Sequence, residues 1–149
     1  MRTDSRLSRM LHVLLHMDGR EAPMTSEQVA AMLGTNAAVV RRTMAGLREA
    51  GYVRSEKGHG GGWRLACDLK KVTLLDILRA VGSERLFAIG FDNETPDCLV
   101  ERVVNASVAG VMDRAEALLI EGLKGVTLAD LADQFRAELG AMTSPAPHD

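Results

Sequence analysis

The histidines and cysteines of this 149-residue chain are the side chains that could ligate a metal or act as nucleophiles. His12 and His16 share one face of any helix that contains them, but a zinc site needs at least a third ligand and none follows at a useful spacing. Cys67 and Cys98 are too few for a four-cysteine zinc site or a secreted disulfide framework. The sequence therefore predicts no enzyme active site, and we expect both cysteines to be reduced thiols.

A second set of polar residues is suited to phosphate rather than to catalysis. Residues 53–66 read as two short strands around a turn, 58–62, in which four of the five residues are glycine. Glycine adopts positive φ at no steric cost and lets the backbone approach another surface. Lys57, His59 and Arg64 flank this turn and favour a negatively charged surface. The hairpin is either a DNA-binding wing or a glycine-rich surface turn, and the neighbouring segments must decide between these interpretations.

Two amphipathic helices are predicted at the start of the chain. Apolar residues spaced by three and four indicate a first helix over about 5–17. The second helix is expected to begin at Thr25, which forms a capping box with Gln28, and to end at Gly34.

A third helix is predicted from Asn36, a favourable N-cap, to Gly51. Two helices joined by about three residues form a helix-turn-helix pattern, and the hairpin that follows completes a winged helix. Val40, Met44 and Leu47 would face the core, so the opposite face is free to enter a major groove. With the helix N-termini and the wing, this face gives the predicted DNA-binding residues, which are Thr25, Ser26, Asn36, Ala37, Ala38, Arg41, Arg42, Lys57, His59, Gly60 and Arg64.

Arg41 and Arg42 are the candidates for reading bases. An arginine can bond to guanine through two hydrogen bonds, although most protein–DNA contacts go to phosphate. Thr25 and Ser26 open a helix whose free N–H groups favour a phosphate oxygen, and simple capping is the alternative role. Trp63, the only tryptophan, is expected to fill the core beneath the hairpin rather than to stack on a base.

The predicted organisation has four parts. Residues 1–82 form the winged helix-turn-helix domain, which includes a helix from Thr73 to Gly82, and residues 83–97 form an irregular connector. Residues 98–140 form a long dimerisation helix, capped by Asp97, and a terminal helix. Residues 141–149 form a frayed tail. We find no internal repeat. The expected fold is thus mainly α, with a two-stranded wing and a long C-terminal helix.

The long helix carries an apolar stripe whose members are spaced alternately by four and three residues. Such a heptad-like spacing suits a surface shared by two copies of the chain. The alternative is a helix folded onto its own domain, but the connector separates it from the winged core. The predicted dimer-interface residues are Val104, Val108, Val111, Ala115 and Leu118.

Charge is unevenly distributed along the chain. Residues 1–65 contain ten Arg and Lys against six Asp and Glu, whereas residues 66–149 contain eight against fourteen. The basic half is the half with the predicted wing, as expected for a protein that binds DNA. No apolar run approaches the length of a membrane span, and the start of the chain lacks the apolar core of a signal peptide, so we expect a cytoplasmic protein without membrane contact.

Several of these motifs together resemble the Rrf2 (BadM/IscR-like) family of bacterial transcription regulators. They are Leu47 to Val53, the run from Lys57 to Ala66, Val72-Thr-Leu74 and Val126 to Leu131. The resemblance covers about residues 5–140 and implies a homodimeric winged-helix protein that binds a palindromic operator, usually as a repressor. The alternative function is a protein-interaction module that keeps the scaffold without binding an operator.

Several members of that family bind an iron–sulfur cluster through three connector cysteines, the last within a Cys-Leu-x-His run. Here Cys98-Leu99-Val100-Glu101 keeps that cysteine, has glutamate in place of histidine, and no cysteine lies between residues 68 and 97. A cluster needs about four protein ligands, mostly thiolates, so we expect no cofactor. Cys98 remains a possible redox sensor, because a helix N-terminus lowers a thiol pKa; a buried apolar cysteine is the simpler alternative.

Overall fold

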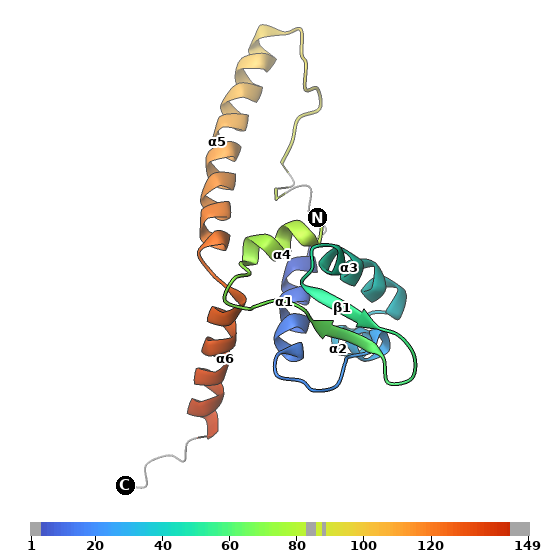
Figure 1. Cartoon of the computed structure of the whole chain (residues 1–149). Helices are drawn as coiled ribbons and strands as arrows, with labels where there is room; N and C mark the ends of the chain where they lie inside the picture. Colours follow the sequence, from blue (N-terminus) through green and yellow to red (C-terminus); the bar gives the residue numbers. More distant parts are fainter. Residues whose placement is uncertain (1–3, 83–85, 88, 144–149) are drawn as a thin grey trace, which may run out of the picture.

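The computed structural model describes residues 4–82, 86–87 and 89–143. Within these ranges it contains six helices and one two-stranded antiparallel sheet (Figure 1). In chain order the elements are α1 (Arg6–Met17), α2 (Ser26–Leu33), α3 (Ala37–Glu49), β1 (Val53–Glu56), β2 (Gly62–Leu65), α4 (Leu74–Ala80), α5 (Leu99–Lys124) and α6 (Leu128–Thr143). Residues 83–85, 88 and 144–149, which fall in the predicted connector and tail, lie outside the described residues, as do residues 1–3 of the first domain.

The first four helices and the hairpin surround one apolar core, which confirms the predicted winged-helix fold. Its largest fully buried side chains come from α1, α3, α4 and α6: Leu14, Met44, Leu47, Ile77 and Leu128. Leu128 is the first residue of α6, so the terminal helix is anchored in the same core as the helix-turn-helix.

The helix ends follow the capping chemistry expected from the sequence. The Thr25 hydroxyl accepts a hydrogen bond from the Gln28 amide (3.1 Å), and the Gln28 side chain accepts one from the Thr25 amide (2.9 Å). Gly34 ends α2 in the left-handed conformation, with φ of +65°. Asn36 then caps α3 by accepting a hydrogen bond from the Val39 amide (3.1 Å). These caps set the sharp turn that separates α2 from α3.

A short antiparallel bridge joins the winged domain to the C-terminal helices. Thr73 lies opposite Thr127, the Leu74 amide donates to the Val126 carbonyl, and the Leu128 amide donates to the Val72 carbonyl, both at 2.9 Å. Each threonine also starts a capping box, with Asp76 and Asp130 respectively.

The two segments that form this Thr73–Thr127 bridge have the same pattern, Val-Thr-Leu-x-Asp. The match is five residues long and is one capping box that occurs twice, so it is not a repeated structural unit of the roughly 20 to 50 residues typical of repeat architectures.

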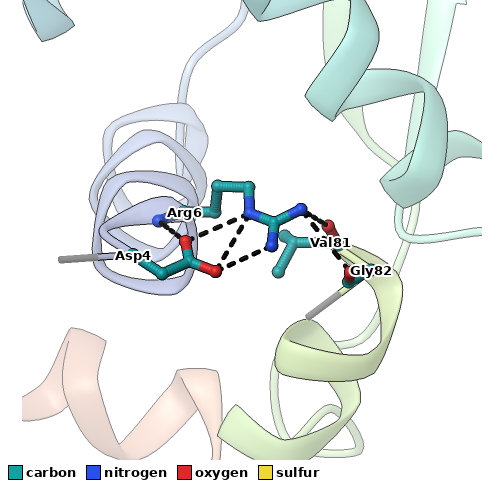
Figure 2. Close-up of polar contacts among 4 residues, drawn as sticks. All are labelled: Asp4, Arg6, Val81 and Gly82. Carbon is teal, nitrogen blue, oxygen red and sulfur yellow. Dashed lines mark hydrogen bonds and ion pairs between the residues drawn. The ribbon is translucent and has the colours of Figure 1, made fainter. Parts of the chain in front are cut away.

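Arg6 connects the start of α1 to the end of α4 (Figure 2). Its guanidinium donates hydrogen bonds to the carbonyl of Val81 at 3.1 Å and to that of Gly82 at 3.5 Å, and it forms an ion pair with Asp4 at 2.7 Å. The last carbonyls of a helix have no partner within the helix, so Arg6 supplies the missing donors. The place where the chain leaves the winged domain is thereby fixed.

The long helix α5 extends beyond the winged domain, and α6 continues from its C-terminal end along the side of α1 (Figure 1). None of the residues of α5 is buried. Its N-cap is Cys98 rather than the predicted Asp97, because the helix begins one residue later. α6 ends at Thr143, so residues 141–143 of the predicted frayed tail are helical; the Thr143 hydroxyl donates to the Leu139 carbonyl at 3.1 Å. No helix within the described residues is long and apolar enough to cross a membrane.

Candidate nucleic-acid interface

The outward face of α3 consists of small residues and arginine. Val40, Met44 and Leu47 are buried, so the opposite face turns to solvent. Ala38 and Arg42 on that face are exposed. Small side chains next to a cation let the helix backbone come close to a groove. The predicted orientation of α3 is therefore confirmed.

The two predicted base-reading arginines lie in different surroundings. The Arg41 guanidinium lies 2.9 Å from the Glu27 carboxylate of α2, and both side chains are more than half exposed. An exposed pair of this kind contributes at most about 1 kcal/mol and can be exchanged for another partner. The Arg42 side chain makes no hydrogen bond or ion pair with the described residues. The Arg42 guanidinium is therefore available to an approaching ligand without first breaking a hydrogen bond or an ion pair to the described residues.

Ser26 has an internal role. Its side chain is buried, and its hydroxyl accepts a hydrogen bond of 3.0 Å from the indole N–H of Trp63. Trp63 is also buried and, as expected, fills the core beneath the hairpin. A buried indole N–H needs an acceptor, but the sequence does not show which residue provides it. Thr25, half-buried at the start of the same helix, keeps the position expected for a phosphate contact.

The hairpin is held against the start of α2. Beyond the β1–β2 pairing, Met24 forms an antiparallel bridge with Trp63: the Met24 amide donates to the Trp63 carbonyl at 3.0 Å, and the reverse bond is 2.7 Å. Gly62 makes this approach possible, since its φ is +148° and an added Cβ would lie 2.5 Å from the Met24 carbonyl oxygen. The bridge brings the wing beside the N-terminus of the helix-turn-helix.

The turn of the wing presents its cation and imidazole to solvent. Lys57, His59 and Gly60 are all exposed. Gly58 and Gly60 have positive φ, and the Gly61 amide donates to the Gly58 carbonyl at 3.0 Å. The turn therefore has a fixed backbone conformation, which the positive φ of its glycines makes possible.

Arg64, the fourth predicted wing residue, is engaged within the protein. Its Nε lies 2.7 Å from a Glu56 carboxylate oxygen, an ion-pair distance without the alignment of a hydrogen bond, and its Nη1 donates to the Glu21 carbonyl. Arg54 lies opposite Arg64 in the sheet and 3.7 Å from the same carboxylate, with its side chain mostly exposed. Arg54 is not among the predicted DNA-binding residues. Because side chains alternate along a strand, the residue after the buried Val53 must point outward, and this alternation could have identified Arg54 as a candidate.

The two cysteines lie in contrasting surroundings. Cys98 is exposed, and hydrogen bonding from the backbone amide of Glu101, then from that of Val100, lowers the pKa of its thiol. The thiol makes no capping hydrogen bond of ordinary geometry. Burial, with the nearby Asp68 carboxylate, raises the pKa of the half-buried Cys67. The simpler alternative for Cys98, a buried apolar side chain, does not apply within one chain.

The remaining candidates form no metal centre. The rings of His12 and His16 lie next to each other in α1, with centroids 4.8 Å apart and planes tilted by 59°. Within the described residues, no group of three or more His, Cys, Asp and Glu side chains is arranged to hold a metal ion. Cys98 has no second cysteine in the connector, so the donors on this chain do not fit an iron–sulfur cluster that requires about four ligands.

Comparison with known proteins agrees with this geometry. The model of the Rrf2 family, described as an iron-dependent transcriptional regulator, matches residues 3–134. The chain belongs to the Rrf2 family. This Rrf2 chain is 27% identical over 129 residues to the protein rrf2 of Nitratidesulfovibrio vulgaris, covering 87% of this chain and 84% of the relative. It is 30% identical over 135 residues to YwnA of Bacillus subtilis, which is classed with the HTH-type transcriptional regulators, covering 89% and 98% respectively.

Its fold is also similar to solved Rrf2 structures. The structure of IscR from T. potens superposes with a TM-score of 0.65 at 21% identity, covering 98% of this chain and 94% of IscR. Family membership confirms that this Rrf2 chain is a transcriptional regulator rather than an enzyme.

Proposed function

We propose that this Rrf2 protein is a homodimeric repressor that binds a palindromic DNA operator. In this proposal α3 enters the major groove, Arg42 reads a base, and the wing reaches the adjacent phosphates or minor groove through Lys57 and His59. One observation supports this most strongly. The exposed face of α3 carries Arg42, which has no partner among the described residues, and the Met24–Trp63 bridge holds the helix-turn-helix beside the glycine turn that presents Lys57 and His59.

Thr25, Asn36, Ala37, Ala38, Arg41 and Gly60 complete the proposed contact surface. The N-termini of α2 and α3 supply free N–H groups for phosphate oxygens, and the alanines permit close approach. The side chains of Ser26 and Arg64 have partners within the protein and support this surface, and their contact with DNA stays a prediction.

The exposed apolar face of α5 supports the homodimer. Val104 is 53% exposed and Val111 57%, and Leu118 is 76% exposed. A soluble regulator would cover so large an apolar stripe, and the heptad-like spacing suits a second copy of the same helix. Val108 and Ala115 complete the predicted interface. Two copies related by a twofold axis would present two copies of α3, which matches the symmetry of a palindrome.

Cys98 is proposed as a redox-responsive residue of the regulator, acting without a bound cluster. Its exposure and its lowered thiol pKa favour thiolate formation and oxidation. Operator affinity should change after mild oxidation in the native chain and should stay unchanged in Cys98→Ser. Identical responses of the two proteins would remove this role. As a regulator of DNA, the protein would act in the cytoplasm.

The experiment for the whole proposal begins with selection of bound fragments from genomic DNA by the purified protein. Fluorescence anisotropy then measures affinity for the selected operator and for random DNA at several salt concentrations. We expect two chains per operator, and an affinity that falls roughly thousandfold between about 50 and 200 mM salt if about six phosphates are contacted. Salt-independent binding, or a strictly monomeric protein, would contradict the proposal. Failure to select any DNA would favour the protein-interaction module.

A further inference from the structure

A groove of about 520 Å³ lies between the connector and α5. Figure 1 shows the connector, in yellow, running beside the helix. We call this hollow the connector groove. Four carboxylates line it, two from each wall: Asp92, Glu94, Asp113 and Glu116. None of them forms an ion pair or a side-chain hydrogen bond within the described residues, and no lysine or arginine among those residues lines the groove. The described part of its lining is therefore acidic, with four carboxylates and no basic side chain.

The inside of the groove is apolar and partly aromatic. Phe87, Phe91 and Met112 contribute to its lining and are half-buried, and Ile89, also in the lining, is 64% exposed. A metal ion is a poor occupant, because these side chains offer it no ligands and the carboxylates form no metal-binding group. Aromatic faces and a polarizable thioether instead suit an organic cation, which is attracted by the ring face and also buries apolar area.

The groove and the apolar stripe proposed for dimerisation lie on different faces of α5. The α5 residues that line the groove are Ala109, Met112, Asp113 and Glu116. The last three follow Ala109 by three, four and seven positions, so all four lie on one face of the helix. The apolar stripe proposed for dimerisation occupies a different face, about one third of a turn away. Arg102 lines an adjoining hollow that shares Phe91, Glu94 and Ala109 with the groove, whereas Asp113 and Glu116 line the connector groove alone. Pairing through the stripe alone would therefore not require Asp113 or Glu116 to be buried.

We propose that the connector groove is a binding site for a hydrophobic organic cation, such as a phosphonium or quaternary ammonium compound with aromatic or alkyl groups. The volume falls within the range of about 300 to 1,000 Å³ that is usual for small-molecule sites. The carboxylates bind the positive charge, and the phenylalanines and Met112 contact the apolar groups. Because the groove joins the connector to α5, its occupant would act as an effector; that role rests on the proposed regulator function, whereas the binding itself does not.

The test is calorimetric titration of the full-length protein with tetraphenylphosphonium, without DNA. Tetraphenylborate, of nearly the same shape and opposite charge, is the matched probe. We expect the phosphonium to bind and the borate to bind at least about tenfold more weakly. The double variant D113N/E116Q should lose about tenfold in phosphonium affinity, because two partly exposed ion pairs are removed. The variant D92N/E94Q tests the opposite wall in the same way.

Glu138→Gln on α6, an exposed carboxylate outside the groove, is the control and should bind the phosphonium like the native chain. Circular dichroism establishes that each variant is folded. The proposal is overturned if the phosphonium does not bind at millimolar concentration, if the borate binds equally well, or if both folded double variants keep native affinity. Since the titration contains no DNA, any of these results leaves the regulator function to be judged by operator binding alone.

Discussion

Arg41 and Arg42 are adjacent in sequence but differ in what they must give up to contact DNA. Arg41 already pairs with Glu27, whereas Arg42 has no partner among the described residues. We predict that Arg42→Ala weakens operator binding by about 1 to 3 kcal/mol and weakens binding to random DNA much less. Arg41→Ala, the matched comparison, should reduce both affinities by a similar small factor. Anisotropy titrations on both DNAs measure this, and an equal loss for Arg42→Ala would show a phosphate contact instead.

The cysteines should differ in the pH at which they react. The pKa of Cys98 is lowered by backbone amides, so its reactive thiolate forms at lower pH than in an ordinary cysteine; the pKa of Cys67 is raised by burial, so its thiolate forms at higher pH. We predict that iodoacetamide alkylates Cys98 faster at every pH below about 8.5, with a lower midpoint. Mass spectrometry of single-cysteine variants gives both rate profiles, and coincident profiles would contradict the prediction.

Individual residues show which features of the site the sequence predicts and which it does not. Arg42 was placed on the outward face of α3 because the positions of Val40 and Met44 fix the rotation of the helix. Ser26 and Arg64 were assigned to DNA because sequence shows a helix start and a charged hairpin, but not the long-range partner. The partners are Trp63, thirty-seven residues away, and the carbonyl of Glu21, forty-three residues away.

At the level of elements, Gly46 in α3 is required by packing rather than by its backbone conformation. An added Cβ would overlap the Ala80 carbonyl oxygen at the end of α4. Helix propensity alone would make Gly46→Ala stabilising by about 1 kcal/mol. We predict the opposite sign, a loss of about 1 to 3 kcal/mol in the free energy of unfolding, because the close contact between the helices must open.

Gly140→Ala in α6 is the control for this prediction, since a Cβ there meets nothing within 4 Å. It should leave stability unchanged or raise it by up to about 1 kcal/mol. Urea unfolding followed by circular dichroism compares the two variants with the native chain. A stabilised Gly46→Ala would mean that α3 and α4 separate easily.

The elements themselves were predictable where a local signal exists. The boxes that begin with Thr25 and Thr73 fix the starts of α2 and α4, and both were predicted from four residues of sequence. The start of α5 was misplaced by one residue because Asp97, a good capping residue, precedes the actual cap, Cys98. The bridge between Thr73 and Thr127 was not foreseen, because pairing of distant segments has no local signature.

At the scale of the whole molecule, the proposed dimer depends on the exposed apolar stripe of α5. We predict that Val111→Glu converts the dimer to a monomer and lowers operator affinity by at least about tenfold, because a charge would have to be desolvated in the interface. The winged domain should stay folded. Light scattering after size-exclusion chromatography and circular dichroism measure both effects.

Arg102→Glu is the control for this variant, since its larger change of charge lies on α5 away from the stripe. It should remain dimeric. A Val111→Glu protein that is still dimeric would place the interface elsewhere on the molecule.

The hydrogen bonds between residues 72–74 and 126–128 run from main chain to main chain. In the proposed dimer paired through α5, these bonds would hold each winged domain in place relative to the paired helices, and main-chain bonds do not depend on which side chains either segment carries. We therefore expect substitutions on the outward face of α3 to alter which bases are preferred while the spacing of the two half-sites is kept.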